Sequence, residues 1–136
     1  MPPKPFYEIN PKTYLFGKSE NPEEKVRQWA IFELISSYGF NINEINVEVP
    51  CKVGSKSILA DIVYREKDPL ILVECKRQED KNQDEALKQA ESYANYLRAD
   101  FLVFTNGLSW VVKRKIQGLW EITVDIPSYK SVAFKR

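Results

Sequence analysis

Two neighbouring stretches in the middle of the chain carry the strongest β-strand pattern. Residues 58–64 (ILADIVY) and 70–76 (LILVECK) are rich in β-branched and aliphatic side chains, and residues 65–69 between them are polar and end in Asp-Pro. Two such runs joined by a short connection with turn residues predict an antiparallel hairpin. Because side chains alternate along a strand, each run presents every second residue to the same face.

Two other stretches repeat apolar positions at the spacing of a helix. The first begins at the capping residue Asn21, has Pro22 in its first turn and reaches Gly39, which can end it. The second follows Asn82, which together with Glu85 forms a plausible capping box. The faces expected to be buried carry Val26, Trp29, Ala30, Leu34, Ile35 and Tyr38 in the first helix and Ala86, Leu87, Ala90, Tyr93, Ala94 and Leu97 in the second.

The remaining strands are expected on both sides of the second helix. Residues 43–50 alternate and predict a strand that completes a three-strand meander with the hairpin. Residues 101–104 follow the second helix and predict a buried strand parallel to residues 70–76. The turn pairs Asn106-Gly107 and Gln117-Gly118 predict antiparallel returns over residues 108–116 and 119–124. The sequence thus predicts an α/β fold with a mixed central sheet.

Length and composition fit a single domain. The chain has 136 residues, 29% of them charged, and a net charge of +1, so it is not a strongly basic nucleic-acid binder. We expect a proline-rich N-terminal arm over residues 1–20, lying on the domain or on a partner, a domain over residues 21–126 and a tail over residues 127–136. No apolar run is long enough to span a membrane, and a cytoplasmic location is expected.

The chemistry open to this chain is restricted by its composition. Histidine is absent, which excludes catalytic triads, histidine-based zinc sites and nucleases with a histidine base. The two cysteines, Cys51 and Cys75, could pair but are expected as free thiols, with Cys75 packed in the core. The basic run Lys113-Arg114-Lys115 is expected to protect an edge strand, with phosphate contact as the alternative.

The predicted hairpin brings two carboxylates together. If Tyr64 pairs with Ile71, Asp61 lies opposite Glu74, and Leu59 lies opposite Lys76. Opposed like charges among apolar neighbours are unfavourable, and a divalent cation between the carboxylates would compensate for them. Mg²⁺ prefers oxygen ligands of this kind. The alternative interpretation is that Glu74 and Lys76 simply lie on a solvent-exposed face of the strand.

The acidic residues and the lysine of this hairpin form a motif that resembles that of a known family. Asp61 followed by Glu74-Cys75-Lys76 resembles the signature of the PD-(D/E)XK nuclease superfamily. The wider set is similar to the nuclease domain at the N-terminus of type I restriction enzyme R subunits over about residues 20–112. It comprises Asn21-Pro22-Glu23-Glu24-Lys25-Val26-Arg27-Gln28, Ala60-Asp61-Ile62-Val63, Leu72-Val73-Glu74-Cys75-Lys76, Gln89 with Tyr93, and Thr105-Asn106-Gly107. The superfamily takes the first letter of its name from a proline directly before the aspartate, and this chain has Ala60 at that position. The resemblance implies a restriction-endonuclease-like αβββαβ core with a mixed central sheet and an added C-terminal hairpin.

The same resemblance assigns roles to individual residues. It implies that Asp61, Glu74 and the main-chain carbonyl of Cys75 hold Mg²⁺, for which Mn²⁺ can substitute, and that Lys76 acts at the attacking water. It implies that Glu24 reaches the metal directly or through water, although a helix-capping carboxylate would also explain that residue. Gln89 and Tyr93, four residues apart on one helix face, would contact the substrate backbone or brace Lys76, unless they are ordinary core and rim residues.

The function expected is Mg²⁺-dependent hydrolysis of phosphodiester bonds in DNA. The alternative is a nucleic-acid-binding or assembly module of a restriction or defence complex that is inactive without a partner or motor subunit. A structural protein with a charged pocket is a third possibility. Type I R subunits continue into a helicase motor, whereas this sequence stops at Arg136. The expected partners are therefore DNA and either helicase and methyltransferase subunits or a second copy of the chain.

Overall fold

The computed structural model describes residues 3–65, 69–79 and 83–128. Its helices and strands follow one another in the order α1 (Pro22–Ser36), β1 (Ile45–Val53), β2 (Lys56–Arg65), β3 (Leu70–Cys75), α2 (Gln83–Leu97), β4 (Phe101–Thr105), β5 (Trp110–Ile116) and β6 (Leu119–Ile122). Short 3-10 turns occur at Pro11–Thr13, Leu15–Gly17 and Ile42–Glu44. The described part of the chain is thus an α/β structure, as expected.

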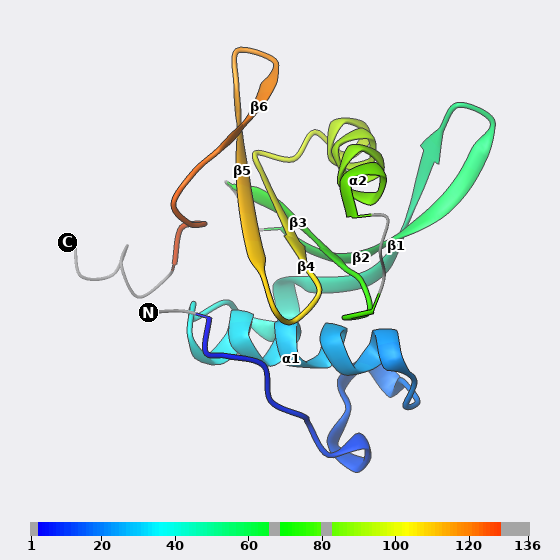
Figure 1. Ribbon diagram of the computed structural model, residues 1–136, viewed down its shortest axis with the longest axis vertical. Helices are drawn as coiled ribbons and strands as arrows, with labels where there is room; N and C mark the ends of the chain where they lie inside the picture. Colours follow the sequence, from blue (N-terminus) through cyan, green and yellow to red (C-terminus); the bar gives the residue numbers. More distant parts are fainter. Residues whose placement is uncertain (1–2, 66–68, 80–82, 129–136) are drawn as a thin grey trace.

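The six strands form one mixed sheet in which spatial order follows chain order, β1 to β6. β3 and β4 are parallel, as the crossover through α2 requires, and every other neighbouring pair is antiparallel. α1 and α2 cover opposite faces of this sheet (Figure 1). The predicted register of the central hairpin is confirmed, because Tyr64 pairs with Ile71 and Val63 with Leu72.

Each face of the sheet has its own apolar core. The core beneath α1 contains Trp29, Leu34, Ile62 and Val73, and the core beneath α2 contains Val63, Leu72, Ala90, Ala94 and Leu97. Most of the apolar residues predicted to face the core in the two helices therefore do pack in it. Cys75 is fully buried on the α1 side and both cysteines are free thiols, as predicted.

The caps of α1 follow the sequence pattern. The side chain of Asn21 accepts a hydrogen bond from the Glu24 amide at 2.8 Å. At the other end Gly39 adopts φ of +78°, so the chain turns and the Phe40 amide bonds the carbonyl of Leu34 at 2.9 Å. The helix itself ends earlier than Gly39, at Ser36. The capping box predicted at Asn82 lies outside the described residues.

The N-terminal arm lies on α1, the first of the two places expected for it. Phe6, Tyr7 and Leu15 pack against the α1 core. Buried polar side chains of α1 hold the arm: Glu33 accepts from the amide of Lys4 at 2.7 Å, and Gln28 bonds both the amide and the carbonyl of Leu15 at 2.9 and 3.1 Å. α1 is therefore covered on two sides, which explains why polar residues are buried in it.

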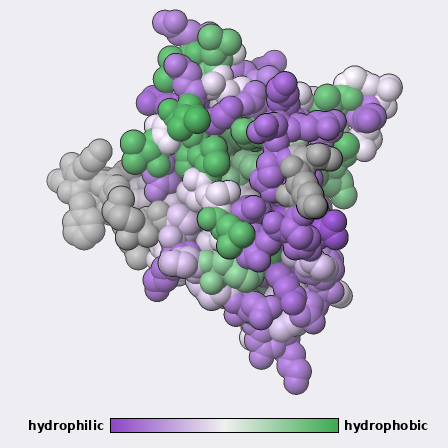
Figure 2. All heavy atoms as spheres, viewed as in Figure 1, coloured by the Kyte–Doolittle hydropathy of each residue, from purple (hydrophilic) through white to green (hydrophobic). Residues whose placement is uncertain are grey.

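The role predicted for the basic run of β5 is wrong. β6 pairs with β5 on its outer side, so β5 is an interior strand and its charges do not guard an edge. Lys113 bonds Glu91 of α2 at 2.6 Å, and Lys115 bonds Asn95 of α2. These cations fasten the hairpin to α2. Hydrophobic residues of the β5–β6 hairpin remain exposed (Figure 2), among them Leu119 and Ile122.

Candidate functional site

The candidate site lies where β2 and β3 stop pairing as a regular ladder. The last paired residues are Ile62 and Val73. One step further, the Asp61 amide donates to the Glu74 carboxylate at 2.9 Å, and the Cys75 amide donates to the Asp61 carboxylate at 2.8 Å. Each acidic side chain thus binds the main chain of the opposite strand. This reciprocal pair of hydrogen bonds holds the two carboxylates side by side.

The predicted pairing of Leu59 with Lys76 is wrong. β3 ends at Cys75, and the amide of Lys76 donates to the carbonyl of Thr105 in β4 at 2.9 Å. The backbone after Glu74 therefore follows β4, because carboxylates have replaced the main-chain partners between β2 and β3. Leu59 is 56% exposed and lines the mouth of the cavity beside Asp61. Leu59, one of the apolar neighbours predicted for Asp61, is therefore largely exposed.

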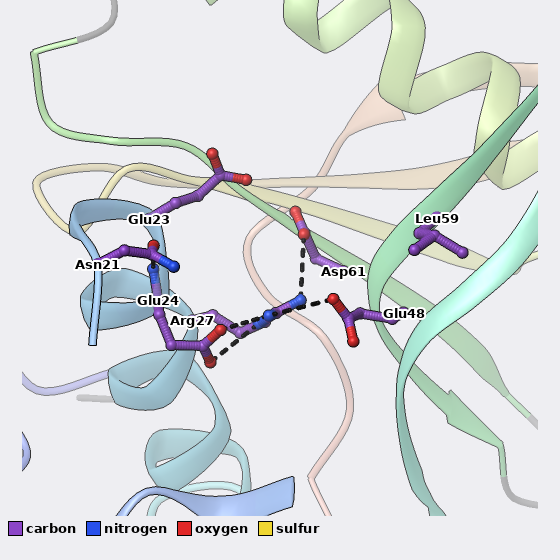
Figure 3. Close-up of a pocket in the computed structure, with 7 residues that line it drawn as sticks. All are labelled: Asn21, Glu23, Glu24, Arg27, Glu48, Leu59 and Asp61. Carbon is purple, nitrogen blue, oxygen red and sulfur yellow. Dashed lines mark hydrogen bonds and ion pairs between the residues drawn. The ribbon is translucent and has the colours of Figure 1, made fainter. Parts of the chain in front are cut away.

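This cavity has a volume of about 350 Å³ and lies between the N-terminal turns of α1 and the strands β1 and β2. Its lining is polar and mostly acidic, and consists of Asn21, Glu23, Glu24, Arg27, Glu48, Leu59 and Asp61 (Figure 3). Helix and strands therefore present their carboxylates to the same space.

Arg27 is the cation at the centre of these acids. Its guanidinium donates to both carboxylate oxygens of Glu24 and lies 3.6 Å from Asp61 and 3.7 Å from Glu48 (Figure 3). Burial disfavours the charged guanidinium, but the hydrogen bond and charge of Glu24, with the charge of Asp61, outweigh it and raise the pKa of Arg27. Arg27 therefore stays charged in this position.

Glu24 does not face Asp61 directly. The residue is 3% exposed, and its carboxylate accepts a hydrogen bond from Gln28 at 2.8 Å besides those from Arg27. Sequence analysis considered two roles for Glu24, contact with the metal and helix capping. The structure shows a third role: the Glu24 carboxylate anchors Arg27, which in turn contacts Asp61. The sequence motifs include Arg27 but gave it no role at the site, although its place three residues after Glu24 is the spacing of a helical ion pair.

Glu48 is the second residue that the sequence did not reveal. It lies in β1 between Val47, which pairs with Ile62, and Val49, which pairs with Ala60, so it stands opposite Asp61. Its φ of +52° is unusual for a residue with a side chain. Its carboxylate bonds Lys18 of the arm and approaches Arg27. Extending the predicted hairpin register by one strand would have placed it beside Asp61.

The protonation of the central pair is strongly perturbed. Burial raises the pKa of Asp61, while the Cys75 amide and the Arg27 charge act against this rise. Burial, followed by the charge of Asp61, raises the pKa of Glu74 well above its usual range. Lys76 is half-buried, and its charge lowers the pKa of both acids. Perturbed acids next to a cation in a cleft are typical of functional sites.

Of the two α2 residues predicted at the site, Tyr93 lies near it. Its pKa is raised by burial and by the charge of Glu74, while the charge of Lys76 acts in the opposite direction. Tyr93 also packs at the border of the α2 core. Gln89 is exposed. The roles predicted for this pair at the substrate stay predictions.

The donors around Asp61 and Glu74 fit a hard divalent cation in kind. Both are carboxylates, and the Cys75 carbonyl lies between Glu74 and Lys76 in the chain. Within residues 3–65, 69–79 and 83–128, no group of three or more His, Cys, Asp or Glu side chains is arranged to hold a metal ion. Mg²⁺ typically takes one or two carboxylates and completes its shell with water and phosphate oxygens.

An α/β protein with a mixed sheet and a buried carboxylate pair beside a lysine is the class that these observations define. The family model described as "Type I restriction enzyme R protein N terminus" matches residues 22–127. The chain belongs to this family, as its sequence motifs indicated. No curated protein and no solved structure matches it. Neither helix in the described residues is long and apolar enough to cross a membrane.

Proposed function

We propose that this chain is the nuclease domain of a restriction system and that it hydrolyses phosphodiester bonds of DNA with a divalent cation, Mg²⁺ or Mn²⁺. Membership of the restriction enzyme R protein family supports a role in such a system. The order α1, three strands, α2 and β4 agrees with a restriction-endonuclease-like αβββαβ core, to which β5 and β6 would be the added hairpin. DNA in the cytoplasm would be the substrate, and helicase and methyltransferase subunits would be the partners.

One observation carries this proposal. The Asp61 carboxylate bonds a main-chain amide of β3 and the Glu74 carboxylate bonds a main-chain amide of β2, so the two acids are held side by side. Together with the Cys75 carbonyl they would hold the cation, which would withdraw electron density from the scissile phosphate and neutralise its charge. The reciprocal hydrogen bonds fix both carboxylates before any ligand arrives, so little reorganisation is needed.

The side chain of Lys76 has a separate role in this proposal. Its charge acts on both Asp61 and Glu74, which supports a place for the ammonium at the same site. There it would orient the attacking water and stabilise the charge that develops as the bond from phosphorus to the leaving oxygen breaks. Tyr93, on the adjacent face of α2, would contact the DNA backbone.

Cleavage of supercoiled plasmid in Mg²⁺ or Mn²⁺, with and without EDTA, tests the proposal. The wild type should nick or linearise the plasmid only with metal, and Lys76→Ala should reduce the rate about 100-fold or more while the fold is retained. Lys12→Ala, at an exposed lysine in the Pro11–Thr13 turn of the arm, is the matched lysine control and should cleave normally. Equal rates for Lys76→Ala and the wild type, or no metal-dependent cleavage at all, would refute hydrolysis at this site.

A further inference from the structure

The acidic cavity beside Asp61 contains more negative than positive charge. Four carboxylates line it, those of Glu23, Glu24, Glu48 and Asp61, and Arg27 is the cation in the lining. Lys18 of the arm engages Glu48 from the rim. Without Arg27, the largely buried carboxylates of Glu24 and Asp61 would line the cavity with no positive charge between them, which is costly.

Arg27 is built into this position from both ends. On the helix side Glu24 takes two hydrogen bonds from the guanidinium, and the Glu24 side chain is itself fixed by Gln28. On the strand side the guanidinium approaches Asp61 at 3.6 Å, a distance typical of an ion pair without a tight hydrogen bond. The arginine is thus held firmly by Glu24 and loosely by Asp61 (Figure 3).

The carboxylate of Asp61 does not depend on Arg27 for its orientation. Its Oδ2 atom accepts the Cys75 amide at 2.8 Å, whereas the Arg27 contact is made to Oδ1. Removing the guanidinium would therefore leave the carboxylate in place and take away only its counter-charge. A cation that approaches Asp61 would meet this positive charge first.

We propose that Arg27, anchored by Glu24, is the resident counter-cation of Asp61, and that a divalent cation entering the site takes over this role. The proposal rests on the proposed function for the divalent cation, and it gives Glu24 the task of positioning Arg27. Arg27 is a positioning residue in this scheme. Its presence keeps the metal-free site folded and weakens the affinity for metal.

The test compares Arg27→Gln with Lys25→Gln in EDTA and in a Mg²⁺ titration followed by calorimetry and thermal melting. Lys25 is a matched control, because it lies two residues away on α1 and pairs with Glu8 and Glu20 outside the cavity. Arg27→Gln should melt well below the control in EDTA. It should bind Mg²⁺ roughly ten- to a hundredfold more tightly than the wild type, because a unit charge a few Å from a divalent ion is worth about that much. Arg27→Lys, which keeps the charge, should bind Mg²⁺ nearly as the wild type does.

A double-mutant cycle separates this proposal from the proposed function. In EDTA, the loss of melting temperature caused by Arg27→Gln should shrink when Asp61→Asn is already present, because the counter-charge is then no longer needed. An undiminished loss would overturn the role of Arg27, and so would a weaker or unchanged Mg²⁺ affinity of Arg27→Gln. If the wild type shows no Mg²⁺ binding that Asp61→Asn removes, the metal-dependent function fails together with the handover, while the cycle in EDTA still decides whether Arg27 balances Asp61.

Discussion

Replacing Glu74 by Gln should stabilise the metal-free protein. Glu74 is 4% exposed and lies beside Asp61. Its carboxylate accepts a hydrogen bond from the main-chain amide of Asp61. The amide oxygen of Gln can accept the same hydrogen bond, so the substitution removes a charge and keeps the shape. Asp61 is the less suitable position for this test, because its charge is partly balanced by Arg27 at 3.6 Å.

The size of the effect follows from the separation of the two acids. Directly opposed residues on paired strands have Cβ atoms about 5 Å apart, and we take about that separation for these two carboxylates, each of which bonds the main chain of the other's strand. Two unit charges at that distance repel by roughly 1 to 3 kcal/mol at effective dielectric constants between about 80 and 20. Lys76 and Arg27 offset part of this, so we expect Glu74→Gln to gain about 1 to 2 kcal/mol at pH 8 in EDTA. For a chain of this length the melting temperature should rise by about 3 to 7 °C.

The pH dependence gives this prediction its sign. The pKa of Glu74 is raised in the folded protein, so the unfolded chain loses this proton at a lower pH than the folded chain does. Between the ordinary and the raised pKa the folded state binds more protons, and wild-type stability falls as pH rises through that interval. The advantage of Glu74→Gln should therefore be absent at pH below the ordinary pKa of glutamate and grow to its full size above the raised one.

Urea unfolding from pH 4 to 8 in EDTA measures both the size and the pH dependence. Asp61→Asn is the comparison variant and should gain less than Glu74→Gln, because it also loses the pairing with Arg27. In Mg²⁺ the order should reverse in favour of the wild type, since a ligand that binds only the folded state stabilises it. A Glu74→Gln protein that is less stable than the wild type in EDTA at pH 8 would refute the repulsion argument.

Two further substitutions test how the arm is held against the domain. Gly107→Ala should cost about 1 to 3 kcal/mol in thermal or urea unfolding, because Gly107 has φ of +89° and a Cβ would lie 3.1 Å from the Phe6 ring. Gly118→Ala, with φ of +80° and open space around it, should cost less, and equal costs would contradict the contact with Phe6. Glu33→Ala removes the buried acceptor of Tyr7 and of the Lys4 amide, and should cost roughly 1 to 3 kcal/mol. Limited proteolysis should then cut the arm faster than in the wild type, and an unchanged cutting rate would refute the role of Glu33.

Local pattern was sufficient to predict the central hairpin and the turns. The register of Tyr64 with Ile71 follows from strand alternation and the length of the connection, and the turn at Asn106-Gly107 follows from its residue types. The Asn106 side chain accepts from the amides of Leu108 and Ser109, which is what asparagine does in such turns. These features depend on neighbours close in the chain.

The site roles that the sequence analysis did not predict, those of Arg27 and Glu48, depend on long-range geometry. Arg27 contacts Asp61 across 34 positions of the printed sequence, and Glu48 meets Lys18 of the arm across 30. A charged residue on a helix or strand is most often solvated, so its type carries little information until a partner is placed opposite it. The divergence of β2 from β3 was equally hidden, because it arises from the carboxylates of Asp61 and Glu74 taking main-chain partners.

The strained backbone at Glu48 has a structural reason in the two-layer core. On one side of Glu48, Val47 packs in the α1 core, and on the other side Val49 packs in the α2 core. In β2 the same change of layer occurs between Ala60 and Ile62, on either side of Asp61. The strand pair thus passes from one core to the other at this point.

The polar side chains at this change of layer, those of Glu48 and Asp61, are left in neither core, so they meet α1 in the acidic cavity. A positive φ costs of order 1 to 3 kcal/mol, and such strain persists where the surrounding structure fixes it. The change of layer, not the strand pattern, therefore explains why the carboxylates gather here.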